Sequence, residues 1–360
     1  MSKTITLYNV DKIVSSAGTE VEIDNMSAGG SASAAGLAIT RAEDADSIDY
    51  SFNVGGNTHA ANGSSASASE MLHAGGAINN ANHASPSNGI SVMSIASASD
   101  QVVSATLSAG RYGGTGTSDG AKAFLAGGAS DAGGGTYFNN VDEYGFASQA
   151  VTGNYSTLNT TRRYMSSSSD GQTAIFFGGM TQNFPVFNTH EAVSFSGSST
   201  ATQWTDVSCG AGGGATSNGS ESLFSVGQHA DGLNSGAKRV QKLSHAANES
   251  SESWGESATV AEWTNIAASN GVDAFLVTSS SNTAHIEKLS FSDSSAHAVE
   301  NSAATALDSL GSPSSGSDGS HAFFIQANSA RSVSFDSGAA AASFCSMSIY
   351  RELGFGTQGN

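Results

Sequence analysis

One short turn motif recurs along the chain at nearly constant spacing. Five copies of Ser-Asp-Gly or Ser-Asn-Gly follow this spacing, centred on Asp119, Asp170, Asn218, Asn270 and Asp318, and a sixth, Ser87-Asn88-Gly89, does not. Successive centres are 51, 48, 52 and 48 residues apart. A short apolar run follows each turn. A repeat of about fifty residues with strand-like content in every copy is typical of a β-propeller rather than of a domain with a single core.

The apolar run after each turn contains two adjacent large residues. The five pairs are Phe124-Leu125, Ile175-Phe176, Leu223-Phe224, Phe275-Leu276 and Phe323-Phe324. Neighbouring residues of a strand point to opposite faces, so both faces of this strand must be covered, as they are when a blade lies between two others. A sixth copy lies upstream, where Met71-Leu72 leads into Gly75-Gly76 and Ser67-Ala68 replaces the turn dipeptide.

The remaining elements of each copy follow in the same order. An alternating segment, such as Val240 to Leu243, predicts a strand with one drier face, and a more variable strand follows it. The small residues before each turn, such as Ser166 to Ser169, suit the crowded innermost position near an axis. The sequence therefore predicts an all-β propeller of six blades, with seven as the alternative.

The better preserved copies resemble kelch repeats. In such repeats an apolar strand ends in a Gly-Gly doublet and a basic residue precedes the next inner strand. Residues 110–128 fit this pattern with Arg111 and Gly127-Gly128, and residues 162–179 fit it with Arg162 and Gly178-Gly179. The last three copies depart from it, because Val226-Gly227, Thr278-Ser279 and Gln326-Ala327 replace the doublet. The resemblance covers residues 58–360 and implies a kelch-like propeller; it implies little about function, because such propellers serve many roles.

Residues 1–57 do not follow the repeat. Three segments are predicted to be strands, namely residues 4–10, 19–23 and 47–54. The segment is either an attachment module or a degenerate extra blade, and the short stretch before Met71 favours the module. We expect the ring to close by side-chain packing between whole blades, with residues 57–69 as the inner strand of the first copy.

Composition limits the partners. Only 12% of residues are charged, and 13 basic against 31 acidic residues give a net charge of −18. Because such an acidic surface repels nucleic acid and anionic membranes, neither is an expected partner. No run approaches the ~18 apolar residues of a membrane span, and the start resembles no signal peptide. The two cysteines, Cys209 and Cys345, lie in copies that are not adjacent and predict no disulfide framework.

The search for catalytic chemistry predicts no catalytic residue, no cofactor and no metal site. The nine histidines are scattered and lack the spaced pairing with a carboxylate that zinc sites show. Asp142-Glu143 could be offered as a glycosidase pair, but adjacent strand residues diverge. Asp or Asn recurs in the repeated turn because both residue types tolerate turn conformations. The chain is therefore predicted not to be an enzyme, with a propeller glycan hydrolase as an alternative.

Abundant Gly, Ser and Ala, degenerate kelch-like repeats, acidity and the lack of a signal peptide resemble repeat proteins of tailed, especially marine, bacteriophages. The resemblance implies a virion protein made in the host cytoplasm, part of a homo-oligomer or larger assembly. The leading expectation is a tail fibre or receptor-binding propeller that contacts a host surface glycan or protein. The alternative is a structural or decoration subunit of the capsid or tail that binds other virion proteins.

Long connections after the doublets are the predicted recognition sites, because loops on a rigid scaffold usually carry recognition. They span residues 77–88, 129–140 and 180–189. Aromatic rings beside asparagines could stack on sugars and hydrogen-bond their hydroxyls. The alternative is that the rings hold the loops down on their blades. The candidate binding residues are Tyr137, Phe138, Asn139, Asn183, Phe184 and Phe187.

Overall fold

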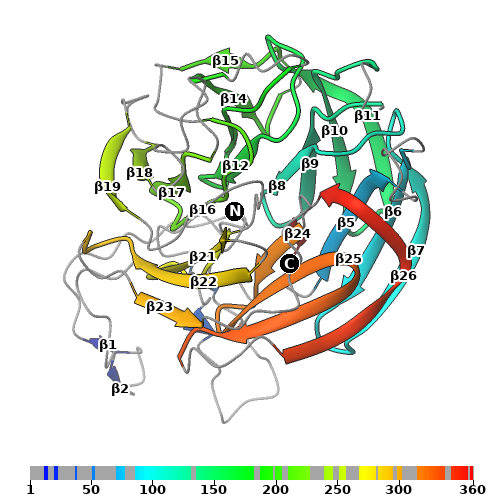
Figure 1. Cartoon of the computed structure of the whole chain (residues 1–360). Helices are drawn as coiled ribbons and strands as arrows, with labels where there is room; N and C mark the ends of the chain where they lie inside the picture. Colours follow the sequence, from blue (N-terminus) through cyan, green and yellow to red (C-terminus); the bar gives the residue numbers. More distant parts are fainter. Residues whose placement is uncertain are drawn as a thin grey trace.

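The computed structural model is a six-bladed β-propeller, and no helix occurs in the residues that it describes (Figure 1). Those residues are 12–14, 20–22, 37–38, 51–52, 70–77, 86–130, 135–181, 187–197, 199–204, 210–227, 239–245, 251–256, 267–280, 283–294, 298–301, 314–336, 342–355 and 357–359. No helix long and apolar enough to cross a membrane occurs among them. The six-blade prediction is confirmed.

Blades 2 to 5 are four-stranded antiparallel sheets whose strands follow chain order from the centre outward. Blade 2 is β8 (Thr115–Ser118), β9 (Lys122–Ala126), β10 (Asn140–Gly145) and β11 (Ala150–Thr157). Blade 3 is β12 (Ser166–Ser169), β13 (Thr173–Phe177), β14 (His190–Ser194) and β15 (Thr202–Gln203). Blade 4 is β16 (Ala215–Ser217), β17 (Glu221–Ser225), β18 (Arg239–Ser244) and β19 (Glu252–Glu256). Blade 5 is β20 (Ala267–Ser269), β21 (Asp273–Ser280), β22 (Thr283–Ser290) and β23 (Ala298–Asn301).

Blades 6 and 1 share one continuous sheet, in which the C-terminal strand closes the ring. Blade 6 contains β24 (Ser314–Ser317), β25 (His321–Ser334) and the first part of β26 (Ala342–Phe355). The last part of β26 pairs with β5 (Glu70–Ala77), which continues blade 1 into β6 (Gly89–Ser94) and β7 (Ser99–Thr106). β27 (Gln358–Gly359) also pairs with β5. Figure 1 shows β26, in red, reaching from β25 to β5.

This closure corrects the expectation that whole blades close the ring by side-chain packing alone. Residues 352–359 supply the innermost strand of blade 1, at the position expected for residues 57–69. The backbone N–H of Leu72 donates to the carbonyl of Thr357 at 2.7 Å. The physical reason is that β5 would otherwise present an unpaired inner edge, and a strand from the other end of the chain satisfies it.

Within the described residues, six apolar clusters each lie between two neighbouring blades, and a smaller seventh contains Tyr112 and Ala129. Blades 2 and 3, for example, enclose Phe124 and Phe176, whereas Leu125 faces blade 1 and Ile175 faces blade 4. The same division holds in the other copies. Adjacent residues of each second strand therefore enter different clusters, which confirms that both faces of this strand are covered.

The repeated turns form one rim of the ring, here called the turn rim. In each copy the Asp or Asn side-chain Oδ1 accepts two backbone N–H bonds, as Asp170 does from Gln172 (2.8 Å) and Thr173 (2.6 Å). The preceding serine accepts a bond from the glycine N–H two residues on, as Ser169 does from Gly171 at 2.9 Å. The same bonds recur at the other four turns.

The same serines also connect neighbouring blades. Three of these hydroxyls donate to the carbonyl of the equivalent serine in the preceding blade: Ser169 to Ser118 (3.0 Å), Ser217 to Ser169 (2.6 Å) and Ser269 to Ser217 (2.8 Å). All four serines are fully buried. This series, called the serine ladder below, stabilises the innermost strands, because a buried carbonyl needs a partner and a short hydroxyl is what fits there.

The N-terminal strands pair with one another and not with a blade. β1 (Lys12–Val14) pairs with β2 (Glu20–Glu22), and β3 (Leu37–Ala38) pairs with β4 (Ser51–Phe52). β2 and β4 fall within predicted strands, whereas residues 4–10 lie outside the described residues. The attachment role of residues 1–57 stays a prediction.

Deleting residues 351–360 should open the seam between blades 6 and 1. The deletion removes the partner of the β5 inner edge together with the buried ring of Phe355. Loss of such a ring alone typically costs about 3–5 kcal/mol, and a bare edge promotes association. We expect a lower melting temperature by circular dichroism and larger species in size-exclusion chromatography.

The matched control is Phe355→Leu in the full-length chain, which keeps the closing strand and an apolar side chain. It should elute at the same size as the unaltered protein and melt close to it. A truncated protein that elutes at an unchanged size and melts at an unchanged temperature would contradict closure by this strand.

Candidate functional site

The rim opposite the turns, here called the loop rim, contains the described ends of the long predicted connections, such as residues 135–140 and 187–189. The second strands β9 and β13 end there and the inner strands β8 and β12 begin there, because these strands run antiparallel. The Gly-Gly doublets lie at this rim with positive φ, for example 62° at Gly127 and 103° at Gly128. A Cβ on Gly127 would stand 2.5 Å from the Arg162 carbonyl, so only glycine fits at this junction between blades.

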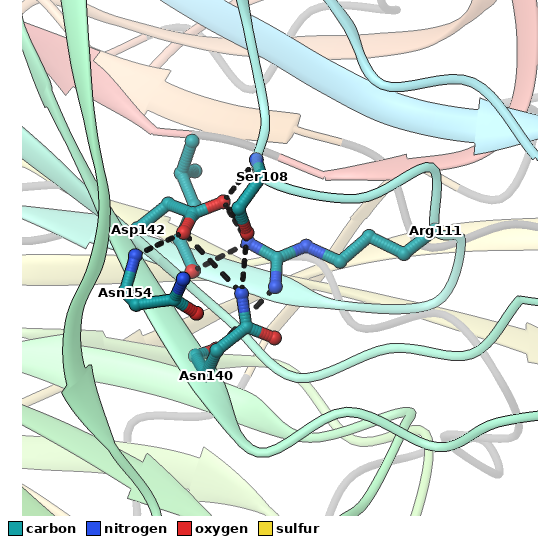
Figure 2. A network of polar contacts seen from close by, with 6 residues as sticks. Ser108, Arg111, Asn140, Asp142 and Asn154 are labelled. Atoms are coloured by element: carbon teal, nitrogen blue, oxygen red, sulfur yellow. Dashed lines mark hydrogen bonds and ion pairs between the residues drawn. The ribbon is translucent and has the colours of Figure 1, made fainter.

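A buried ion pair stabilises the base of the loop rim in blade 2 (Figure 2). Arg111 Nη2 lies 3.0 Å from Asp142 Oδ2, and both side chains are fully buried. The same guanidinium donates to the Leu125 carbonyl at 3.0 Å. Burial lowers the pKa of Arg111, while the charge of Asp142 acts in the opposite direction. A buried charge needs such a partner, so this pair is a structural element of the blade.

Asp142 also collects hydrogen bonds from the surrounding chain. Its Oδ2 accepts from the backbone N–H and the hydroxyl of Ser108, both at 2.9 Å. Its Oδ1 accepts from the Asn154 N–H at 2.8 Å and from Asn140 Nδ2 at 3.3 Å. Ser108 belongs to the chain entering blade 2, so the carboxylate connects that segment to strands β10 and β11. Figure 2 shows these groups converging on Asp142.

Blade 3 repeats this arrangement with Arg162 and Glu191, which form a buried ion pair. Glu191 Oε2 accepts from the backbone N–H of Asn159 at 2.6 Å. Blade 4 has lost both charges. Gly210 takes the place of the arginine, because its carbonyl accepts from the backbone N–H of Gly179 just as the carbonyl of Arg162 accepts from the backbone N–H of Gly128. Gln241 stands where the acid would be, opposite Phe224 as Glu191 is opposite Phe176. The loss of both charges together avoids an uncompensated buried ion.

The carboxylates considered for glycoside hydrolysis have separate partners. Asp142 faces Arg111, whereas Glu143 pairs with Lys122 at 2.9 Å. The two side chains leave opposite faces of β10, as the strand period requires. Within the described part of the chain, no group of three or more His, Cys, Asp and Glu side chains is placed to hold a metal ion.

A second arginine at the loop rim is surrounded by tyrosines. The Arg163 guanidinium carbon lies 4.8 Å from the ring centroid of Tyr164, 5.3 Å from that of Tyr137 and 5.6 Å from that of Tyr112. Its Nη1 donates to the Tyr112 hydroxyl. Burial raises the pKa of Tyr164, partly opposed by the charge of Arg163. This set of four residues is called the Arg163 cluster below.

The structure places the predicted binding residues against the blades. Tyr137 belongs to the Arg163 cluster, and the Phe187 ring lies 5.3 Å from the guanidinium carbon of Arg162. The backbone N–H of Phe138 donates to the Gly128 carbonyl, and the Phe138 carbonyl accepts from the backbone N–H of Arg162. Asn139 Nδ2 donates to the Leu158 carbonyl at 3.0 Å. Asn183 and Phe184 lie outside the described residues. Tyr137, Phe138 and Asn139 are thus brought together, while Phe187 lies over a different arginine.

Sequence reasoning missed Arg163, Tyr112 and Tyr164 as candidate site residues. Their signal was present in Gly110-Arg111-Tyr112 and in Arg162-Arg163-Tyr164. Both segments were interpreted only as repeat positions. What reveals the cluster is the spatial approach of described residues from three connections: 107–114, 127–130 with 135–139, and 158–165.

His190 is a buried titratable group beneath the loop rim. It is fully buried, and neither ring nitrogen has a hydrogen-bond partner. Its ring stacks on Phe177 at 5.9 Å between centroids and meets Trp204 edge-on at 5.4 Å. Burial, with a smaller contribution from the charge of Arg162, lowers its pKa from 6.5 to about 4. The neutral imidazole therefore acts as an aromatic packing residue.

Comparisons with known proteins identify no family. No protein-family model matches the sequence, and no curated protein matches it. Among solved structures, one titled "Structure of YjhT" is similar with a TM-score of 0.49 and 12% identity, over 72% of this chain and 89% of that chain.

Replacing Arg111 and Asp142 by glycine and glutamine, the residues at these positions in blade 4, should show that the two side chains are strongly coupled in stability. We expect Arg111→Gly and Asp142→Gln each to lower the free energy of unfolding by about 3–5 kcal/mol, because each leaves a buried partner unmatched. The double variant should lose less than the sum by about 1–3 kcal/mol. Urea unfolding of the four proteins measures this cycle.

The control cycle uses Lys122→Gln and Glu143→Gln, since that pair is part-exposed and should couple by no more than about 1 kcal/mol. Additive losses at Arg111 and Asp142 would refute the structural role given to their ion pair.

His190→Phe should flatten the pH dependence of stability between pH 6.5 and pH 4. The folded-state pKa of His190 is depressed to about 4, so as the pH falls through this window the unfolded chain takes up a proton that the folded protein does not. Stability is thus full above about pH 6.5 and decreases toward pH 4, by up to about 3 kcal/mol at 1.36 kcal/mol per pKa unit.

The measurement is urea unfolding at several pH values for the unaltered protein and the variant. Subtracting the free energies of unfolding of the two proteins at each pH cancels the contribution of carboxylate titration, which both proteins share. A constant difference across the window would show that His190 titrates normally.

Proposed function

We propose that the protein is a non-enzymatic bacteriophage virion protein, a kelch-like propeller that serves as a tail fibre or receptor-binding unit and contacts a host surface glycan or protein. The observation that carries the proposal is the contrast between the two rims. The turn rim repeats one hydrogen-bonding pattern five times, as at Asp119 and Asp318. The connections at the loop rim vary in length and sequence, as recognition on a constant scaffold requires.

The phage assignment rests on the sequence. Degenerate repeats rich in small residues and a net charge of −18 support a virion component. The same charge argues against nucleic acid as the partner. Other virion proteins would be the constant partners, with residues 1–57 as the attachment module.

A second candidate function is a structural or decoration subunit of the virion. It is favoured by the placement of Tyr137 and Phe187, whose rings lie on arginine side chains of the propeller. Rings used in this way hold the connections in place, which suits a rigid contact surface for a neighbouring virion protein.

Binding of the purified, fluorescently labelled chain to host cells and to an array of bacterial surface glycans tests the proposal. We expect binding to host cells and to a subset of glycans, with at least about a tenfold loss of affinity on replacing Phe184 and Phe187 by alanine. The control is Val272→Ser, at an exposed position near the turn rim, which should bind unchanged.

The other outcomes contradict the proposal in different ways. Binding to phage particles alone would favour the decoration subunit. Shortened polysaccharide chains after incubation would show a glycan hydrolase. An unchanged affinity of the double loop variant would remove that connection from recognition.

A further inference from the structure

Arg163, unlike Arg111 and Arg162, has no carboxylate partner among the described residues. Arg111 pairs with Asp142 and Arg162 pairs with Glu191, whereas Arg163 is half-buried among three tyrosines. A guanidinium has five N–H donors, and in the described part of the chain the hydrogen bond to the Tyr112 hydroxyl uses one of them. The cluster thus retains unmatched positive charge in a protein of net charge −18.

Two buried polar atoms of the cluster are also unmatched. Arg163 Nε and the Tyr137 hydroxyl oxygen are enclosed and have no hydrogen-bond partner among the described residues. Buried polar atoms in native proteins are almost always paired, so unpaired ones call for an explanation such as a ligand group. The two side chains lie 5.3 Å apart, measured from guanidinium carbon to ring centroid.

The position of the cluster agrees with such a role. Tyr112 comes from the connection entering blade 2, Tyr137 from the connection between β9 and β10, and Arg163 and Tyr164 from the connection entering blade 3. Antiparallel bridges join Tyr112 and Tyr137 to Ala129, and Arg163 to Met180. The backbone around the cluster is therefore fixed by the scaffold, which keeps the donors in place before a ligand arrives.

We propose that the Arg163 cluster binds the carboxylate of a single terminal acidic sugar on the host glycan. A carboxylate matches the guanidinium fork with two parallel hydrogen bonds. The part-exposed rings of Tyr137 and Tyr164 offer apolar faces to the C–H face of the sugar, and a rotation of the Tyr137 side chain on binding lets its enclosed hydroxyl donate to one of the sugar oxygens. The inference rests on the proposed receptor-binding function and specifies its substrate class.

The net charge favours one acidic sugar over a polyanion. A long polyanion would meet the repulsion of the whole acidic surface, whereas one carboxylate at the tip of a neutral chain meets mainly Arg163. The Debye length is about 8 Å at physiological ionic strength, so the distant charges are screened while the direct contact is retained. Moderate salt should therefore weaken this binding only slightly.

The test is calorimetric titration of the full chain with three oligosaccharides that differ only in their terminal residue: glucuronic acid, its methyl ester, and glucose. We expect the acid to bind at least about tenfold more tightly than the other two. Arg163→Gln should abolish this preference, Tyr137→Phe should reduce it about threefold, and Arg163→Lys should retain part of it. An oligosaccharide with a terminal sulfate ester, used as a fourth ligand, distinguishes carboxylate recognition from general anion binding.

Arg239→Gln is the control, because Arg239 is exposed and lies on β18 away from the cluster. It should bind the acidic oligosaccharide as the unaltered protein does. Melting curves of each variant establish folding, and Tyr137→Phe keeps the test decisive if Arg163→Gln does not fold. Equal binding of acid and ester, tighter binding of the sulfate, or an unchanged preference in Arg163→Gln and Tyr137→Phe would overturn the inference.

Cell binding separates failure of this site from failure of the proposed function. Host-cell binding that survives both Arg163→Gln and Tyr137→Phe would leave the receptor-binding function standing and reject the acidic-sugar site. Binding of the acidic oligosaccharide without any host-cell binding would support the site and reject the receptor role.

Discussion

The structure depends on one repeated interaction, in which the turn serines of blades 3, 4 and 5 each donate to the carbonyl of the equivalent serine in the preceding blade. The same hydroxyl accepts the glycine N–H of its own turn, as Ser217 does from Gly219 at 2.9 Å. Local turn geometry and the spacing between blades are therefore set by the same atom. The adjacent second strands then lie close enough for their paired apolar residues to form the clusters between blades.

Much of this could be predicted from the sequence because it is repeated. The turns, the apolar pairs and the order of strands recur in linear sequence, and recurrence identifies a propeller even where individual residues have diverged. Closure by residues 352–359 could not be predicted in this way, because a closing strand occurs once and pairs residues nearly 300 positions apart. The Arg163 cluster was hidden for a related reason: it joins side chains from three connections, and the equivalent of Arg163 in blade 2 is Tyr112.

The buried charges show how the repeat tolerates divergence. Blades 2 and 3 retain an arginine and an acid, while blade 4 has neither and uses Gly210 and Gln241. In blade 4 both charges are lost together, because a lone buried ion is costly. By contrast, Arg163 has no acid in the described residues and lies at the rim where the connections differ.

The most direct test of the serine ladder is urea unfolding of Ser217→Ala beside Ser320→Ala. Ser217 is buried and bonds to both Ser169 and Gly219, whereas Ser320 is exposed in an equivalent turn region. The account predicts that Ser217→Ala lowers the free energy of unfolding by about 1–3 kcal/mol, because two buried backbone groups lose their partner, while Ser320→Ala changes it by less than about 0.5 kcal/mol. Equal stability of the two variants would contradict it.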